Sequence, residues 1–321
     1  MEVVSYAVML ISLFIIEIIY FKIAKHYHII DRPNDRSSHK KATIRGGGII
    51  FCFAFLLYPI FFETTPFYFL AGLLCLGLIS FLDDLKPRDF KVRMIIHLIA
   101  VTLMFVQLGV FSLPVYVIIL AVIFAIGTIN AVNFMDGING ITGGYSFVTL
   151  LTLLYINHYV VNFIEKDFII TALIGVMVFN FFNFRKKAVC FAGDVGSICM
   201  AFILVFIILK LVIHTNNMSY ISLLLIYGLD VVSTIFFRVL RKENIFEAHR
   251  THLYQYLVNE KKMPHLQVVA VYCLVQCLVN LILIYYPVNN LSYLATVLLL
   301  MGILFVVFRL KYQGQKYLLG K

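Results

Sequence analysis

The sequence contains few charged residues. Asp, Glu, Lys and Arg together make up 13% of the 321 residues, whereas a soluble globular domain carries about 25%. Hydrophobic residues make up 62% of the chain, and no long polar stretch interrupts them. This composition excludes a soluble protein and leaves no room for a separate soluble domain. We therefore expect a single membrane-embedded domain over residues 1–321.

Paired cysteine motifs are also absent. The chain has six cysteines, none in a CxxC pair, and most of them fall inside apolar segments. Neither a disulfide framework nor a zinc site is indicated by such spacing. We interpret these cysteines as small buried hydrophobic residues.

Long apolar runs fill most of the sequence. A helix that spans a membrane needs about 20 mostly apolar residues, and the runs predict about eleven such helices, which makes the fold class an all-α integral membrane protein. We expect the spans near residues 3–22, 47–62, 66–83, 94–110, 113–130, 141–157, 168–184, 196–214, 219–237, 267–286 and 290–309.

The basic residues predict an orientation, because Lys and Arg prefer cytosolic loops. When alternate loops are counted, 24 of the 26 basic residues fall on one side, and Lys166 and Lys210 fall toward the other. This count includes Arg309, assigned to the C-terminal tail. The N-terminus is then outside and the C-terminus cytosolic. The net charge of +10 needs no nucleic-acid partner, and a basic rim suits anionic lipid headgroups.

Polar residues in a membrane protein are costly unless they pair or function. Here they gather at the predicted cytosolic ends of the helices, in the loops 23–46, 83–93, 130–140, 185–197 and 238–266. Taken singly, each group has a plainer interpretation. Asp, Asn and Gly are common turn residues, and a lone histidine is often structural. Their concentration at one membrane face favours a functional site there.

Three predicted helices begin at this face with a glycine-rich turn, at residues 45–48, 136–140 and 193–196. A helix N-terminus has free N–H groups and a partial positive charge, and glycine permits close approach of an anion. We therefore expect these turns to bind a diphosphate. The nearby aspartates would repel phosphate unless a cation such as Mg²⁺ intervenes, which indicates metal-assisted phosphoryl chemistry.

Five segments, in this order along the chain, resemble the polyprenyl-phosphate N-acetylhexosamine-1-phosphate transferases. The resemblance covers about residues 31–256. It is carried by residues 31–39 with 45–48, by 81–84 with Lys91, and by residues 130–137, 191–197 and 249–252. Any one segment could match by accident, but all of them in order form a specific pattern.

This resemblance implies a reaction. A UDP-N-acetylhexosamine would give its sugar-1-phosphate to undecaprenyl phosphate and release UMP, at the cytosolic face of a bacterial plasma membrane. The donor sugar expected first is GlcNAc, then FucNAc or QuiNAc, and the product would start an O-antigen, capsule or teichoic-acid type of glycan. Mg²⁺ is the expected cofactor, with Mn²⁺ as a substitute, and a homodimer is left open.

The resemblance also implies roles for individual residues. Asp194 would be the chief Mg²⁺ ligand, with Asp83 or Asp84 near the metal, although Asp83 could instead deprotonate the lipid phosphate. The expected catalytic residues are Asp83, Asp84, Asp136 and Asp194. The expected substrate-binding residues are Lys91, Asn130, Asn133, Asn139, Asn183, His249, Arg250 and His252.

Two alternatives remain from the sequence. A muramyl-pentapeptide transferase is the first, disfavoured because the last loop lacks a triple-histidine run. A secondary transporter is the second, disfavoured because transporters place charged residues near the membrane midplane. Direct attack by the lipid phosphate and a covalent aspartyl-phosphate route both remain open.

Overall fold

The computed structural model describes residues 2–31, 42–245, 247, 249–286 and 289–320, and most of them are helical. The helices are α1 (Glu2–His26), α2 (Ile50–Phe61), α3 (Phe67–Leu85), α4 (Phe90–Leu108), α5 (Val115–Met135), α6 (Ile141–Tyr155), α7 (Lys166–Asn183), α8 (Gly193–Thr215), α9 (Leu225–Leu240), α10 (Leu253–Asn259), α11 (His265–Tyr285), α12 (Leu291–Gln313) and α13 (Gln315–Leu319). Short elements join them: the antiparallel strands β1 (Ile30–Asp31) and β2 (Thr43–Ile44), the 3₁₀ turns η1 (Gly47–Ile49), η2 (Val110–Ser112) and η4 (Met218–Leu224), and the π-helix η3 (Ile156–Val160).

The all-α membrane class is confirmed. Within the described part of the chain, nine helices are long and apolar enough to cross a membrane. The remaining two predicted spans coincide with weaker candidates. Residues 47–61 form a shorter apolar helix, and α6 runs directly into η3. Eleven spans therefore stays a prediction, with a helix at each expected place.

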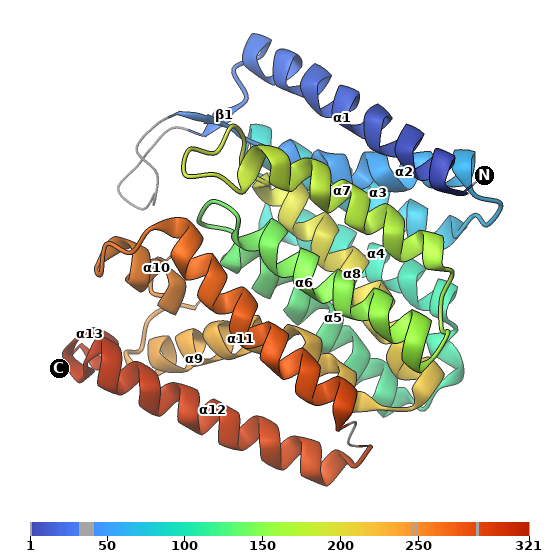
Figure 1. The fold of residues 1–321 in the computed structure, drawn as a ribbon. Coiled ribbons are helices and arrows are strands. Elements are labelled where there is room, and N and C mark those ends of the chain that lie inside the picture. Colours follow the sequence, from blue (N-terminus) through green and yellow to red (C-terminus); the bar gives the residue numbers. More distant parts are fainter. Residues whose placement is uncertain (1, 32–41, 246, 248, 287–288, 321) are drawn as a thin grey trace.

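Helix α8 forms the centre of the bundle. Of its most apolar stretch, 89% is buried, compared with 6% for α12. The helices α2, α3, α5 and α6 and the turn η1 pack against α8. Helices α1 and α12 lie at opposite edges of the assembly (Figure 1). The polar residues at the start of α8 are therefore held by the most enclosed helix of the molecule.

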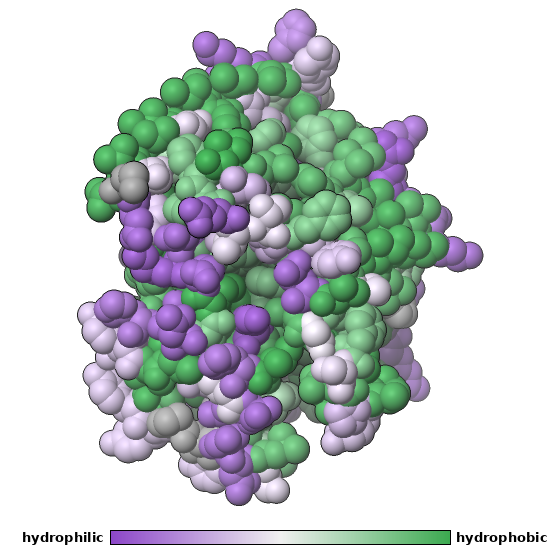
Figure 2. Space-filling model, turned by 90° about the vertical axis from the view of Figure 1, so that its right-hand side faces the viewer, coloured by the Kyte–Doolittle hydropathy of each residue, from purple (hydrophilic) through white to green (hydrophobic). Residues whose placement is uncertain are grey.

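The two chain termini lie at opposite ends of the bundle (Figure 1). We call the end that carries β1, α10 and the C-terminus the site end. Figure 2 views the other end, whose surface carries both polar and apolar areas. The polar groups singled out by the sequence lie at the site end, so the predicted clustering at one end of the helices is confirmed.

A glycine pair allows the two central segments at the site end to touch. A Cβ atom added to Gly48 of η1 would lie 2.2 Å from the Cα of Gly196 in α8, and one added to Gly196 would lie 2.6 Å from the Cα of Gly48. No side chain fits between backbones at that separation. The start of η1 is thereby fixed against the start of α8.

Candidate active site

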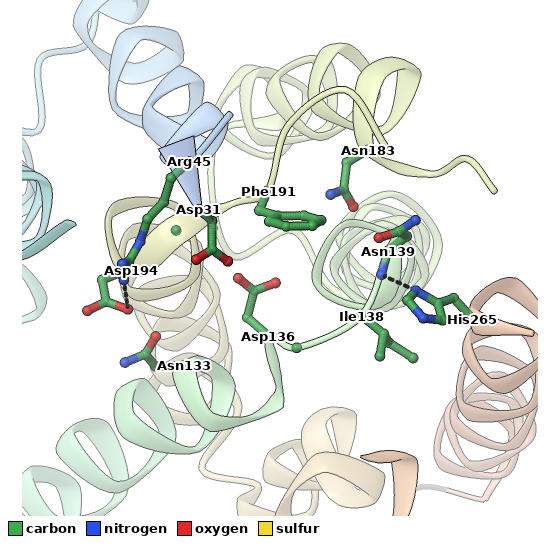
Figure 3. A pocket seen from close by; sticks show the side chains of 12 residues that line it. Asp31, Arg45, Asn133, Asp136, Ile138, Asn139, Asn183, Phe191, Asp194 and His265 are labelled. Atoms are coloured by element: carbon green, nitrogen blue, oxygen red, sulfur yellow. Dashed lines mark hydrogen bonds and ion pairs between the residues drawn. The ribbon is translucent and has the colours of Figure 1, made fainter. Parts of the chain in front are cut away.

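A polar cavity of about 350 Å³ opens at the site end. Segments far apart in the sequence meet there, and the carboxyl groups of Asp31 and Asp136 point toward each other (Figure 3). The lining residues are Asp31, Arg45, Asn133, Asp136, Gly137, Ile138, Asn139, Asn183, Phe191, Gly193, Asp194 and His265. Five of the twelve predicted site residues thus belong to one cavity wall.

Asp84, at the end of α3, holds the loop that leads into α8. Its two carboxyl oxygens accept hydrogen bonds from the backbone N–H groups of Asp194 (2.9 Å) and Val195 (3.0 Å). The Arg45 Nε atom lies 2.6 Å from Asp84 Oδ1, and the Asp84 side chain is fully buried. Both oxygens of Asp84 are therefore engaged by protein groups.

Asp83 and Asp194 lie beside this anchor. Asp83 Oδ1 accepts the backbone N–H of Arg88 at 2.6 Å, and Asp83 Oδ2 lies 2.7 Å from Arg93 Nη1. The Asp194 carboxyl is within hydrogen-bonding reach of Asp83 and keeps 22% of its side chain exposed. Its contact with Arg45 Nη2 is longer, at 3.8 Å. Asp194 is thus the more open carboxylate of the group.

Several N–H groups of the glycine-rich turns are engaged by other groups of the protein. The N–H groups of Gly47 and Gly48 donate to the carbonyls of Phe191 and Ala192, and Asp84 takes those of Asp194 and Val195. Gly140 N–H donates to Asn183 Oδ1 at 2.7 Å. These hydrogen bonds leave the named N–H groups unavailable to a ligand, and phosphate binding by the rest of the turns stays a prediction. Their glycines serve close packing.

The turn after α5 forms one side of the cavity. Asn133 Oδ1 accepts a hydrogen bond from Ser197 Oγ (2.7 Å), and Asp136 Oδ1 accepts one from Thr142 Oγ1 (2.6 Å). Removal from bulk water raises the pKa of the Asp136 carboxyl to about 6; the bond from Thr142 opposes this rise, and the charge of Asp84 adds to it. The protonated form of Asp136 is therefore favoured compared with that of an aspartate in water.

Amide side chains build the other side. Asn183 bridges two loops, because its Nδ2 donates to Cys190 O (2.8 Å) while its Oδ1 accepts from Gly140. Asn139 Nδ2 donates to Arg185 O (3.0 Å), and its backbone N–H donates to His265 Nδ1 (3.2 Å). These contacts fix the 137–140 turn against α11.

His249 and His252 lie outside the cavity lining, behind the 133–137 turn. Their ring centroids are 6.2 Å and 6.4 Å from the ring of Phe134. Burial lowers the pKa of His249 to about 4, aided by the charges of His252 and Arg238. His249 Nδ1 lies 2.7 Å from Arg238 Nη1, so a neutral ring that accepts from the guanidinium fits this contact.

Three further predicted substrate-binding residues also lie outside the cavity lining. Lys91 is exposed, and its backbone N–H bonds to Asp89 at the start of α4. Asn130 turns back to the carbonyl of Ile126, one helical turn earlier. Arg250 is exposed. Of the first motif, residues 32–39 lie outside the described part of the chain.

Comparison with known proteins bears on this geometry. Residues 66–212 match the family model of glycosyl transferase family 4. The chain is 25% identical over 291 residues to a Bacillus subtilis protein named "Probable undecaprenyl-phosphate N-acetylglucosaminyl 1-phosphate transferase", covering 84% of this chain and 81% of that protein. It is 27% identical over 242 residues to a phospho-N-acetylmuramoyl-pentapeptide-transferase of Dictyoglomus thermophilum, covering 69% and 77%.

These matches support the polyprenyl-phosphate N-acetylhexosamine-1-phosphate transferase superfamily. The family match begins just before α3 and ends inside α8, so it contains Asp83, Asp84, Asn133, Asp136 and Asp194. The cavity and its carboxylates are therefore built largely by the part of the chain that matches the family. The relatives indicate a phospho-sugar transferase.

The donor set of this transferase fits a divalent cation. Among the cavity-lining residues, three carboxylates (Asp31, Asp136 and Asp194) face one guanidinium, that of Arg45. No group of three His, Cys, Asp or Glu side chains forms a metal cage within the described residues. Mg²⁺ needs none, since it takes one or two carboxylates and completes its shell with water and phosphate oxygens. Asp194 fits that requirement, and Asp83, which lies within reach of it, would join it by exchanging a contact with Arg88 or Arg93.

Sequence reasoning missed three residues of this region. Arg45 was taken only as a basic loop residue of a motif, although it pairs with Asp84 and Asp194. Nothing in the sequence marks His265, which the fold brings to Asn139. Arg309 was counted with the cytosolic tail, but the structure buries it completely beside Asp230. A charged residue near the end of an apolar helix was the available signal for Arg309.

Proposed function

We propose that this protein transfers N-acetylhexosamine-1-phosphate from a UDP-sugar to undecaprenyl phosphate and releases UMP. The observation that carries the proposal is the cavity wall of three carboxylates and one guanidinium beside Asp83. A diphosphate entering such a site would be repelled without a cation. With Mg²⁺ bound, a sugar nucleotide would bring positive charge to the carboxylates and negative charge to Arg45. The Bacillus subtilis relative is named as a probable transferase of this kind.

The metal would be held by Asp194 and Asp83, and when bound it supplies positive charge at the diphosphate. The protein's own groups would do the positioning that phosphoryl transfer requires. Arg45 lies next to this pair and would neutralise a phosphate oxygen. Asp84 would keep the start of α8 in place through its two backbone contacts.

The nucleoside would occupy the side of the cavity lined by Phe191. Phe191 supplies the one phenyl ring among the lining residues, and nucleobases stack on such rings. Asn139 and Asn183 lie on the same side (Figure 3). We propose UDP-GlcNAc as the first donor, and a cytosolic position of this end of the bundle in a bacterial plasma membrane.

The test is UMP release by purified protein supplied with undecaprenyl phosphate, Mg²⁺ and UDP-GlcNAc. We expect release that requires the lipid, stops with EDTA and is lost in Asp194→Asn. Asp167→Asn is the matched control, because Asp167 lies at the opposite end and contacts Tyr6. We expect that variant to keep normal turnover.

The donor is settled by a panel. UDP-GlcNAc, UDP-FucNAc, UDP-QuiNAc and UDP-MurNAc-pentapeptide are compared at equal concentration. Preference for the pentapeptide donor would favour the activity of the Dictyoglomus thermophilum relative. No UMP from any donor, with protein that is folded and monodisperse, would contradict the transferase proposal.

A further inference from the structure

A buried ion pair joins α9 to α12, behind the histidine loop, which we define as residues 249–252. Arg309 of α12 is fully buried, and its Nη1 lies 3.7 Å from Asp230 Oδ1. The same Nη1 donates to Ser233 Oγ (2.8 Å) and Thr234 Oγ1 (2.7 Å). A charge on a membrane helix is costly unless it is paired. The rest of α12 is mostly exposed, so Arg309 is its main polar anchor in the bundle.

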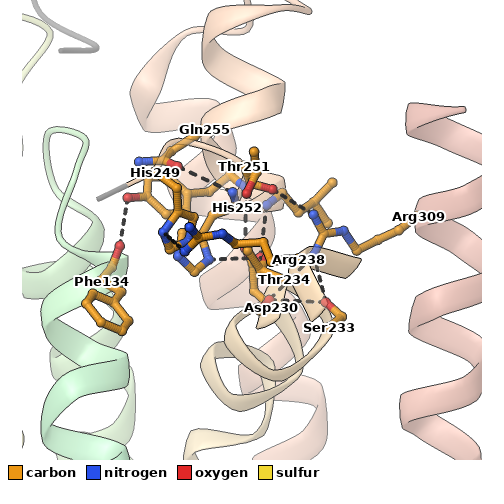
Figure 4. Close-up of polar contacts among 12 residues, drawn as sticks. Phe134, Asp230, Ser233, Thr234, Arg238, His249, Thr251, His252, Gln255 and Arg309 are labelled. Carbon is orange, nitrogen blue, oxygen red and sulfur yellow. Dashed lines mark hydrogen bonds and ion pairs between the residues drawn. The ribbon is translucent and has the colours of Figure 1, made fainter. Parts of the chain in front are cut away.

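The pair also binds the histidine loop from both sides (Figure 4). The other edge of the guanidinium, Nη2, donates to the carbonyl of Thr251 at 2.8 Å. Asp230 accepts the backbone N–H groups of Leu253 (2.9 Å) and Tyr254 (3.3 Å). Arginine therefore fixes a carbonyl before His252, and aspartate fixes the amides after it.

The histidine loop is in turn connected to the cavity wall. Tyr254 Oη donates to the carbonyl of Phe134 at 3.0 Å. A Cβ added to Gly137 would lie 2.3 Å from that hydroxyl. Phe134 and Gly137 lie on either side of Asp136 in the sequence, and Asp136 lines the cavity. A shift at the start of α10 would therefore be transmitted to the turn that carries Asp136.

The loop itself carries buried ring nitrogens suited to contact a ligand. The Nε2 atoms of His249 and His252 are buried and have no hydrogen-bond partner among the described residues. Buried polar atoms are normally paired. Their alignment depends on the backbone held by Arg309 and Asp230.

We propose that Arg309 is a positioning residue for the transferase. From α12 it holds the histidine loop against the 133–137 turn. Turnover depends on the ability of the guanidinium to donate through Nη1 and Nη2 to separate partners, as well as on its charge. This inference rests on the proposed function for its activity readout. Planar bridging of this kind is a property of arginine that lysine lacks.

The deciding variant is Arg309→Lys, in the full-length protein in detergent. Lysine keeps a positive charge near Asp230 and so protects folding, but one ammonium cannot reproduce both guanidinium edges. We expect kcat to fall at least about tenfold, with a smaller change in the KM for UDP-GlcNAc, since small misplacements cost rate. Lys311→Ala is the control, because it removes an exposed charge two residues away; it should behave as wild type.

Amide hydrogen exchange gives a readout that is independent of activity. In Arg309→Lys we expect the amides of Leu253 and Tyr254 to exchange at least about tenfold faster, with an unchanged thermal midpoint. Faster exchange in a protein whose wild type releases no UMP would support the positioning role while the proposed function fails. Wild-type exchange, or a loss of kcat that only follows the loss of folded protein, would overturn the inference.

Discussion

Asp84 and Asp194 both contact Arg45, yet their carboxyl groups have different surroundings. Asp84 is fully buried, and both its oxygens are taken by Arg45 and by two backbone N–H groups of α8. Asp194 is partly exposed, and its contact with Arg45 is long. At the scale of single residues, one aspartate maintains the geometry of the site and the other remains open to a ligand.

This difference predicts opposite effects of two similar substitutions. Asp84→Asn places an amide NH₂ among donors and should cost about 2 kcal/mol of stability. Asp194→Asn removes repulsion between carboxylates, so it should keep the thermal midpoint while turnover falls at least about 100-fold. Thermal unfolding followed by fluorescence, together with UMP release, measures both. An unchanged midpoint in Asp84→Asn would contradict the anchoring role.

His249 predicts a dependence of stability on pH. Its pKa is lowered from 6.5 to about 4, so the folded state takes up the proton less readily than the unfolded chain. The stabilisation that His249 gives to the folded state is complete above pH 6.5 and is lost as the pH falls toward 4. After screening by solvent the loss is on the order of 1–2 kcal/mol.

The measurement compares wild type with His249→Asn between pH 7.5 and 4.5. The variant should lose less stability on acidification, because asparagine can still accept from Arg238 but does not titrate. His26→Asn is the matched control, since His26 is exposed at the end of α1. Parallel stability curves for wild type and His249→Asn would argue against this assignment.

The sequence located the carboxylates but not their tasks. Asp83, Asp84, Asp136 and Asp194 were predicted from residue type and position at helix ends, and all lie at the site end of the bundle. Which oxygen faces Arg45 depends on long-range packing of β2, α3 and α8, which no local pattern encodes. Arg309 was misassigned for the same reason, because only the fold shows Asp230 beside it.

At the scale of elements, the predicted helices agree with the structure where apolar runs are long and differ where they are short or polar. Residues 47–62 begin as a 3₁₀ turn and continue as the short helix α2. The sixth predicted span carries Thr142, Ser146 and Thr149 on α6 and ends as a π-helix. Hydropathy alone cannot decide whether such helices cross the membrane or stop within the bundle.

The contact between η1 and α8 predicts a sharp difference between two glycines. Gly48→Ala would place a Cβ 2.2 Å from Gly196 Cα, where neither backbone can yield, and should cost about 3 kcal/mol or prevent folding. Gly127→Ala on α5 meets nothing within 4 Å and should stay within about 1 kcal/mol of wild type.

Both glycine variants are compared by the yield of monodisperse protein and by thermal midpoint. Near-normal behaviour of Gly48→Ala would mean that the two segments are not in direct contact. Equal losses in both variants would point to a general effect of alanine in place of glycine.

At the scale of the whole molecule, the charge pattern predicts the orientation. Glu63 and Lys187 are exposed at opposite ends of the bundle. An impermeant maleimide applied to intact cells should label Glu63→Cys, whereas Lys187→Cys should react only after permeabilisation. The native cysteines are buried or partly buried, and the wild-type protein sets the background. The reverse labelling pattern would overturn the orientation, and a cysteine at Asp194 reached from both sides would revive the transporter alternative.

The enclosure of α8 has a consequence for how the protein is made. Most of its packing partners, η1, α2, α3, α4, α5 and α6, precede it in the chain, whereas η4 follows it. Chains are synthesised from the N-terminus. The most enclosed helix is therefore synthesised after most of its neighbours and must pack between them. Until then Asp84 lacks the two backbone donors of α8, so a ribosome stalled before residue 193 would expose an unfinished polar cleft. Proteases that degrade incomplete membrane proteins would act on the chain in that state.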